Sequence, residues 1–200
     1  MVLDDLQKKY SHLRTTEIKK DEKFSHGKKL AITIGIKAAK SEWMVFTDAD
    51  CKPVSGKWLK KLSEKFSDET EIVLGYGGYS KEKTILNNLI RYDTLTIALQ
   101  FFSYALSGFP YMGVGRNMAY RKSLFFKNKG FSGHYHIDSG DDDLFINQTA
   151  HKKNTKVCID SDAVMISEPK KSLKEWFRQK KRHLSTPKYY KGKTKFRLGT

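Results

Sequence analysis

The sequence predicts an α/β domain built on a mixed, mostly parallel sheet flanked by helices. Short apolar runs alternate with helical patterns along the chain, which is typical of this class. Hydrophobic residues make up 38% of the 200 residues and charged residues 30%, so the chain can bury a core and is not of disordered composition. One apolar run, residues 43–47, leads directly into acidic residues, as strands do where an open sheet carries its ligand site.

The first half of the chain predicts two helices, then strands and helices in turn. Residues 6–13 have a helical pattern. Residues 30–40 fit both a strand and a helix, and their helix-forming C-terminal end favours the helix. The strand at 43–47 precedes a helix that Ser55 caps and that continues to Phe66.

The middle of the chain predicts a strand at residues 71–76 and a long helix at 84–106. A short strand at 117–121 follows, and a helix at 142–152 begins with acidic residues, which the helix dipole favours at that end. Residues 156–167 predict either a pair of strands or one bent strand.

The last predicted element is a basic helix that ends near Leu184. Ser172 and Glu175 have the spacing of a capping box, so the helix begins between them. The chain carries a net charge of +16, and most of this excess lies beyond residue 168. Such a tail predicts polyanionic partners: nucleic acid, acidic lipid or phosphate groups.

Residues 94–115 contain no charged residue, and 22 residues are enough to span a bilayer. Gln100, Ser103 and Ser107 dilute the apolar character, and Gly108 and Pro110 should end a helix. We therefore expect a buried core helix followed by a loop, with a membrane-contacting segment as the alternative.

The two cysteines, Cys51 and Cys158, lie far apart and have neither zinc-ligand spacing nor a disulfide framework around them. This usage favours a reducing compartment and a core position for both residues.

The sharpest chemical signal is the pair Asp48 and Asp50 at the end of an apolar strand. Two neighbouring carboxylates repel each other unless a cation lies near them, and Mg²⁺ or Mn²⁺ with oxygen ligands suits this pair. A solvated turn is the alternative. Phosphatases of the haloacid dehalogenase type also use D-x-D, but they need Thr or Val at the position that Lys52 occupies here.

A second acidic group comprises Asp138, Asp141, Asp142 and Asp143. Helix capping accounts for one or two of these acids but not for all of them. Crowded carboxylates raise the pKa of one member, which suits a general base, and an acidic helix start without further role is the alternative. His134 and His136 could join Asp138 as metal ligands, although an H-x-H pair in a loop more often lies at the surface.

The third signal lies in the basic helix, where Gln179, Arg182 and His183 share one face. That face can present an amide, a guanidinium and an imidazole together to a diphosphate. An apolar stripe accompanies it, so a basic amphipathic helix on a membrane surface is an alternative reading, and both can hold at once.

These three motifs, in this order, resemble the family 2 glycosyltransferases of the GT-A fold. The motifs read TDAD at residues 47–50, GDDDL at 140–144 and QKKRH at 179–183. Residues 26–43 and 113–125 give supporting matches, and the resemblance covers about residues 23–183. It implies a GT-A-like fold and inverting transfer of a sugar from a nucleotide-diphosphate sugar, in the first place a UDP-sugar.

The resemblance also implies a role for each candidate residue. Asp50, with Asp48 nearby or on the ribose, holds Mn²⁺ or Mg²⁺, and Asp142 is the base that takes the proton of the acceptor hydroxyl. Asp141 and Asp143 would orient this base. Gln179, Arg182 and His183 would close over the donor and the acceptor. Lys28 or Lys29 would touch the donor phosphates, and a solvated lysine pair is the alternative.

Two departures from the family pattern shape the expectations for the whole protein. His183 stands where processive members have Trp, so processive and single transfer both stay open. The family's first strand is not recognisable before Asp48, so we expect a partial catalytic domain at residues 1–168 and a basic amphipathic helix and tail at 169–200. Related members continue into transmembrane helices beyond that point.

The expected setting is the cytoplasmic side of a bacterial cell membrane, in envelope glycan synthesis. The acceptor would be a glycan or a lipid-linked molecule, the tail would meet an anionic membrane surface, and nucleic acid is not an expected partner of this enzyme.

Two rival functions remain. A basic module without catalysis could bind nucleic acid or a membrane surface through the tail, but it leaves Asp48, Asp50 and the acidic cluster unexplained. A nucleotidyltransferase that forms sugar nucleotides also uses paired acids, but it opens with a Gly-rich phosphate loop that this sequence lacks near its start.

Overall fold

The computed structural model describes residues 2–16, 27–137 and 139–199. It divides into two units, Met1–Ala39 and Lys40–Thr200. The first unit holds α1 (Val2–Lys9) and α2 (Gly27–Ala38). Helix α2 confirms the helix expected at residues 30–40. The expectation for residues 6–13 was wrong in its bounds, because α1 begins earlier, with Asp4 and Asp5 in its first turn where the helix dipole favours acids.

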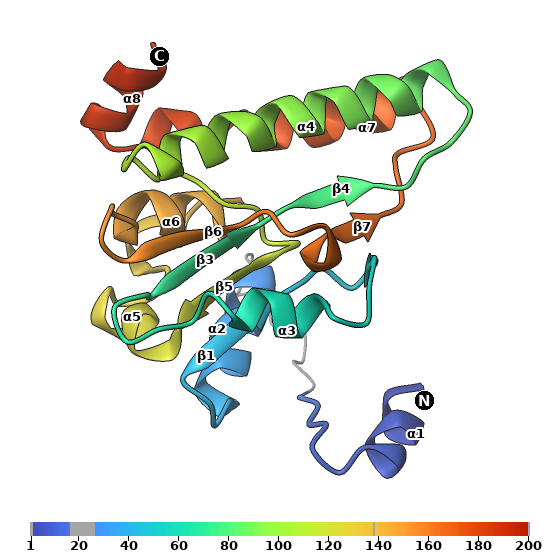
Figure 1. Ribbon diagram of the computed structural model, residues 1–200, viewed down its shortest axis with the longest axis vertical. Helices are drawn as coiled ribbons and strands as arrows, with labels where there is room; N and C mark the ends of the chain where they lie inside the picture. Colours follow the sequence, from blue (N-terminus) through green and yellow to red (C-terminus); the bar gives the residue numbers. More distant parts are fainter. Residues whose placement is uncertain (1, 17–26, 138, 200) are drawn as a thin grey trace. The chain divides into compact units, whose positions relative to one another are not determined.

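The second unit is built on a mixed sheet (Figure 1). Its strands in the described residues are, in spatial order, β1 (Trp43–Phe46), β5 (Met118–Arg121), β3 (Ile72–Gly75) and β6 (Thr155–Cys158). β3 pairs with β6 in parallel, whereas β5 runs antiparallel to both β1 and β3. β1, β3 and β6 therefore share one direction. Because β5 lies between β1 and β3 in the opposite direction, two of the three pairings are antiparallel, so the sheet is mixed, as expected, but not mostly parallel.

A smaller sheet extends from the larger one through two shared chain segments. It consists of β2 (Cys51–Pro53), β7 (Met165–Ser167) and β4 (Gly77–Tyr79), in that order. β3 leads into β4 through Tyr76, and β6 leads into β7 through the 3₁₀ helix η2 (Ser161–Ala163). This confirms the strand pair expected at residues 156–167. β2 and β4 were not expected, because Pro and Gly are depleted in strands.

The other helices of this unit surround the sheets (Figure 1). They are α3 (Trp58–Ser63), α4 (Ile85–Leu106), α5 (Lys122–Lys127), η1 (Ser132–His134), α6 (Asp143–Thr149), α7 (Leu173–His183), η3 (Pro187–Tyr189) and α8 (Gly192–Leu198). The start signal of α7 is confirmed, because the Ser172 hydroxyl accepts a hydrogen bond from the N–H of Glu175. At the start of α4 the Thr84 hydroxyl accepts one from the N–H of Asn87, a cap that was not predicted.

Two helices are shorter than the sequence predicts. The Ser55 hydroxyl accepts a hydrogen bond from the N–H of Lys57 in the preceding turn, so α3 begins only at Trp58 and has no side-chain cap. α6 begins after its cap Asp142, as expected, but ends at Thr149, where the Thr149 hydroxyl bonds back to the carbonyl of Phe145.

Both faces of the larger sheet pack into apolar layers. One layer holds Leu62, Val73, Ala119, Cys158 and Ala163, with Trp43 and Phe66 stacked beside it at a centroid distance of 3.9 Å. The other holds aromatic rings, which are those of Tyr120, Phe125, Phe131 and Phe145. The core position expected for Cys158 is confirmed, whereas Cys51 is half-buried.

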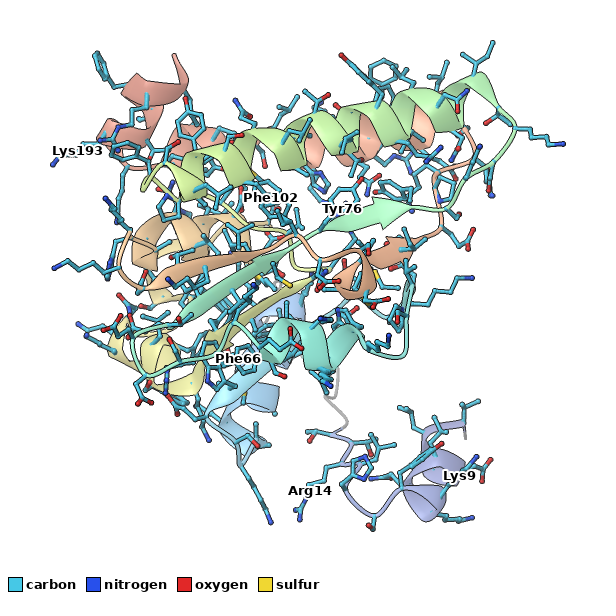
Figure 2. The ribbon with its side chains drawn as sticks, in the orientation of Figure 1. Lys9, Arg14, Phe66, Tyr76, Phe102 and Lys193 are labelled. Carbon is cyan, nitrogen blue, oxygen red and sulfur yellow. The ribbon has the colours of Figure 1, made fainter. Side chains whose placement is uncertain are left out.

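Helix α4 contains most of the uncharged stretch and packs on the sheet through one face, with Phe102 between helix and sheet (Figure 2). Its opposite face is exposed, so the expectation of a buried core helix holds for one face only. The helix ends at Leu106 and a loop follows, as expected. In the part of the chain that the structure describes, no helix combines the length and the apolar character needed to cross a membrane.

Candidate active site

Asp48 and Asp50 lie in the turn between β1 and β2. One ligand atom from each of Asp48, Asp50 and Cys51 lies within 4.8 Å of the other two, and among the described residues this is the group that could hold a metal ion. Asp48 is half-buried and Asp50 is exposed, so water could complete a coordination shell. Two carboxylates suit a hard divalent cation.

The Cys51 thiol fits such a cation less well than the carboxylates do, because sulfur is a soft ligand. Its Sγ lies 2.9 Å from the hydroxyl oxygen of Ser167 and 3.7 Å from Oδ1 of Asp50. These contacts tie the turn to β7, so we assign Cys51 to positioning the Asp50 carboxylate.

Asp142 caps the N-terminus of α6 with its own side chain. Its Oδ1 accepts a hydrogen bond from the N–H of Asp143, and its Oδ2 accepts one from the N–H of Gly115, both at 2.8 Å. A Cβ at position 115 would lie 3.3 Å from that Oδ2, so glycine permits the close approach. The preceding Gly140 has φ +91°, a left-handed conformation that favours glycine. The carboxylate is therefore held in one orientation.

Asp143 has a different environment, because it is buried against the C-terminal segment. Its Oδ2 accepts hydrogen bonds from the hydroxyls of Thr186 and Tyr190, the latter at 2.9 Å, and its Oδ1 accepts one from the N–H of Leu144. Burial raises the pKa of this carboxyl above its ordinary value, although the two hydroxyls oppose the shift. The same burial, with Asp143 nearby, raises the pKa of Tyr190. Asp143 thus anchors the segment that follows α7.

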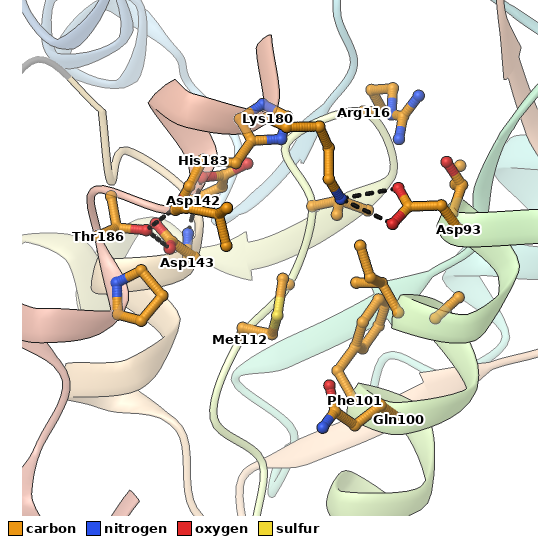
Figure 3. A pocket seen from close by; sticks show the side chains of 18 of the residues that line it. Asp93, Gln100, Phe101, Met112, Arg116, Asp142, Asp143, Lys180, His183 and Thr186 are labelled. Atoms are coloured by element: carbon orange, nitrogen blue, oxygen red, sulfur yellow. Dashed lines mark hydrogen bonds and ion pairs between the residues drawn. The ribbon is translucent and has the colours of Figure 1, made fainter. Parts of the chain in front are cut away.

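A pocket of about 310 Å³ opens beside Asp142 (Figure 3). Its walls are the inner faces of α4 and α7, strand β4, the segment 111–116 and the start of α6. The apolar part of the lining includes Ile97, Phe101, Met112, Val114 and Trp176. Its polar lining includes Asp93, Arg116, Gln179, Lys180 and His183, together with both Asp142 and Asp143 at the start of α6.

Gln179 and His183, one helical turn apart on α7, both line this pocket, and their contact with a diphosphate stays a prediction. The Gln179 amide donates to the hydroxyl of Tyr79 at 3.2 Å. Arg182 is exposed and is not among the lining residues. Lys180 lines the pocket in its stead and forms an ion pair with Asp93 of α4, with Nζ–Oδ2 at 2.7 Å (Figure 3).

Arg116 is a pocket residue that sequence reasoning missed, as it missed Asp93 and Lys180. Its guanidinium lies 4.5 Å from the ring centroid of Tyr79, and one of its nitrogens, Nη1, is buried without a hydrogen-bond partner among the described residues. A cation stacked on an aromatic ring beside a pocket is suited to bind an anionic group. The sequence offered a signal for Arg116, because it lies in the segment 113–125 that supports the resemblance to the family, directly after Gly113 and Gly115.

The two acidic stretches come to the same edge of the larger sheet. The end of β1 pairs with the start of β5, Phe46 opposite Met118, and Gly115 just before β5 holds Asp142. In the smaller sheet Cys51 and Tyr79 both pair with Ser167. Two strand spacings, about 10 Å, therefore separate the D-x-D turn from the pocket wall. Asp48 and Asp50 do not themselves line the pocket.

The other candidates lie elsewhere or stay untested. Asp141 is buried and is not among the lining residues. Lys28 is exposed and Lys29 buried, both in α2 of the other unit, so their contact with donor phosphates stays a prediction. His134 is buried whereas His136 is exposed, and Asp138 lies outside the described residues, so a metal site there has no support.

Comparison with known proteins adds two findings. The sequence model described as Glycosyl transferase family 2 matches residues 2–129. A mannosyltransferase from Pyrobaculum calidifontis, whose structure was determined with GDP-Man and Mn²⁺, superposes with a TM-score of 0.58 at 18% sequence identity. The match covers 87% of this chain and 45% of that one, so the chain spans less than half the length of the matched structure. A search of curated proteins finds no match.

Proposed function

Because the chain belongs to glycosyl transferase family 2, we propose that its site transfers a sugar from a nucleotide-diphosphate sugar to an acceptor hydroxyl. The observation that carries the proposal is the convergence of two acidic motifs at one sheet edge beside a pocket. The β1–β5 pairing brings the D-x-D turn next to the segment that holds Asp142. The structural match supports the GT-A-like fold on which this proposal is built.

Asp48 and Asp50 are the residues that would hold a divalent cation, Mn²⁺ or Mg²⁺. A cation held there would supply positive charge to offset the negative charge that develops on the leaving diphosphate. The clustering of their carboxylate oxygens within 4.8 Å supports this assignment.

Asp142 is the proposed base. Hydrogen bonds from the N–H groups of Gly115 and Asp143 fix its carboxylate at the pocket wall. From that position it can accept the proton of an acceptor hydroxyl as the oxygen attacks the anomeric carbon. Attack from the side opposite the leaving diphosphate inverts the configuration. We assign Asp141 and Asp143 to orienting this base, and the N–H of Asp143 donates to Oδ1 of Asp142.

The donor and acceptor remain broad classes. The expectation of a UDP-sugar gains no support, because the similar structure holds GDP-Man, and we propose a nucleotide-diphosphate sugar with guanosine as the first base to test. Gln179, Lys180 and His183 line the pocket where donor and acceptor would meet, whereas Arg182 is exposed outside its lining. We propose a glycan or lipid-linked acceptor at the cytoplasmic face of a cell membrane.

Thermal unfolding with nucleotides tests the donor site directly. We expect GDP or UDP to raise the melting temperature in the presence of Mn²⁺ or Mg²⁺ and EDTA to abolish the shift, because a ligand at about 100 times its Kd adds roughly 2.7 kcal/mol. Asp48→Asn with Asp50→Asn should remove the metal-dependent shift, and the exposed Asp68→Asn is the matched control. Salt-sensitive oligonucleotide binding without any metal effect would instead favour the nucleic-acid module.

Transfer itself tests the base. Asp142→Asn should lower turnover of the nucleotide sugar by at least a hundred-fold, as removal of a general base commonly does, while the nucleotide shift persists. Unchanged turnover in this variant would remove Asp142 from the role.

A further inference from the structure

The outer face of α4 carries large apolar side chains along its length, with the uncharged polar residues Asn88, Thr96 and Ser103 exposed among them. Six large side chains there are exposed, from 44% for Leu89 to 89% for Ile85. They are Ile85, Leu89, Tyr92, Leu95, Leu99 and Leu106. Their spacing of three, four and seven residues places them on one side of the helix, the α4 stripe. No exposed position of α4 carries a charge, because its two charged residues, Arg91 and Asp93, are half-buried.

The inner face of the same helix is fixed to the protein. Ile90, Ala98, Phe101 and Phe102 are buried against the rest of the unit. Side chains project from the helix on the side away from the sheet as well (Figure 2). With 22 residues the helix is about 33 Å long, and an exposed apolar stripe of that length marks an interaction site. Since one face is packed on protein, the helix can lie along a surface but cannot insert across it.

Helix α7 supplies positive charge beside this stripe. The ion pair between Lys180 and Asp93 holds α7 alongside α4. Leu173, Phe177 and Leu184 form an exposed apolar edge on α7. At 100° per residue, Lys174 and Lys181 lie next to that edge, and both are exposed. The two helices together present apolar side chains bordered by lysines.

We propose that the outer faces of α4 and α7 dock on the surface of an anionic lipid bilayer. Apolar side chains of an interfacial helix enter the boundary between headgroups and acyl chains, and bordering lysines bind anionic headgroups. A second copy of this chain is a poorer occupant. Each copy carries a net charge of +16, and Lys174 and Lys181 are exposed at this face, so two copies repel each other where an anionic bilayer attracts.

Docking in this way has a consequence for the pocket. The inner faces of α4 and α7 form two of its walls, so a bilayer on their outer faces brings the pocket to the membrane surface. This consequence rests on the proposed function, because it gives a lipid-linked acceptor access to Asp142. The docking itself does not depend on it.

Co-sedimentation with vesicles tests the proposal on the full chain without any nucleotide sugar. We expect binding to vesicles of phosphatidylcholine mixed with phosphatidylglycerol, and much weaker binding to phosphatidylcholine alone or at high salt. Leu99→Asp should weaken binding to the vesicles roughly ten-fold or more, since it removes a leucine that the bilayer would bury and adds a negative charge that the anionic headgroups repel. Leu59→Asp on α3 is the matched control, because Leu59 is 53% exposed and Leu99 58%.

A charge variant provides an independent arm. Lys174→Glu with Lys181→Glu should reduce binding to the mixed vesicles by roughly five-fold for each lysine and leave phosphatidylcholine binding unchanged. Thermal unfolding of each variant verifies that it is folded. The proposal is overturned if the wild type binds no vesicle, if Leu99→Asp and Leu59→Asp lose binding equally, or if the wild type is a dimer that Leu99→Asp separates. Failure of sugar transfer with intact vesicle binding would count against the proposed function alone.

Discussion

Asp142 and Asp143 are neighbours in sequence and both line the pocket, but their carboxylates are held differently. Asp142 accepts hydrogen bonds from backbone N–H groups, whereas Asp143 is buried and accepts hydrogen bonds from the hydroxyls of Thr186 and Tyr190. The sequence predicts that the acidic cluster matters, because helix capping accounts for too few of its members. The sequence cannot separate the two roles, since the hydroxyls that donate to Asp143 belong to residues 43 and 47 positions further along the chain.

Gly115→Ala tests whether the orientation of the Asp142 carboxylate matters. The new Cβ would lie 3.3 Å from Oδ2, so the carboxylate must shift by a few tenths of an ångström or lose its hydrogen bond to the N–H of residue 115. We expect roughly ten-fold slower turnover with unchanged nucleotide binding, because small misplacements of a catalytic group are costly. Gly56→Ala is the control, since a Cβ there meets nothing within 4 Å. Equal effects of the two substitutions would contradict the assignment.

The raised pKa of Asp143 predicts a pH dependence of stability. The folded state holds this proton to higher pH than the unfolded state, so the unfolding free energy should fall as pH rises from about 4 through the raised folded-state pKa. Asp143→Asn keeps an acceptor for the Thr186 and Tyr190 hydroxyls and should flatten this slope. Urea unfolding at a series of pH values measures it. A slope of the same size in both proteins would assign the dependence to other groups.

At the scale of elements, the sequence predicts helix positions better than helix faces. Ser172 caps α7 as its spacing from Glu175 indicates, because a cap is a local hydrogen bond. The exposed stripe of α4 could not be predicted, since the helix is apolar on both faces and carries no periodic contrast. Arg182 and Lys180 show the same limit: helix geometry groups side chains by face, but only the packing of α7 on α4 decides which face meets the pocket.

The ion pair between Lys180 and Asp93 should contribute to the packing of α7 on α4. Its side chains are 20% and 28% exposed, so we expect a coupling energy of roughly 1 kcal/mol, near the upper end for such pairs. A double-mutant cycle with Lys180→Met and Asp93→Asn, followed by urea unfolding, measures it. The cycle Lys57→Met with Asp162→Asn is the control, because that pair is 3.8 Å apart and more exposed, and its coupling should be near zero. A coupling no larger than that of the control would show that apolar contacts hold the two helices.

At the scale of the whole molecule, the order of the strands in the sheets could not be predicted from the sequence. Alternating strands and helices predict an α/β fold, and the mixed sheet confirms it. The reversed direction of β5 depends on its pairing with β1 and β3, which lie 70 and 40 positions or more away in the chain. Likewise, the distance between the D-x-D turn and the pocket depends on how β2, β7 and β4 pair. Local patterns contain neither kind of information.

The net charge of +16 makes the molecule repel itself, and this predicts a response to salt. Raising NaCl from a low to a physiological concentration shortens the screening length to about 8 Å, so we expect the melting temperature to rise. Lys193→Glu with Lys195→Glu lowers the positive charge at α8, where Lys193 is exposed, and should reduce the salt response while raising stability at low salt. Differential scanning calorimetry in both proteins measures the effect. A melting temperature that falls with NaCl would mean that ion pairs such as Lys180–Asp93 outweigh the repulsion between like charges, and the charge-reduced variant would then be the less stable protein at low salt.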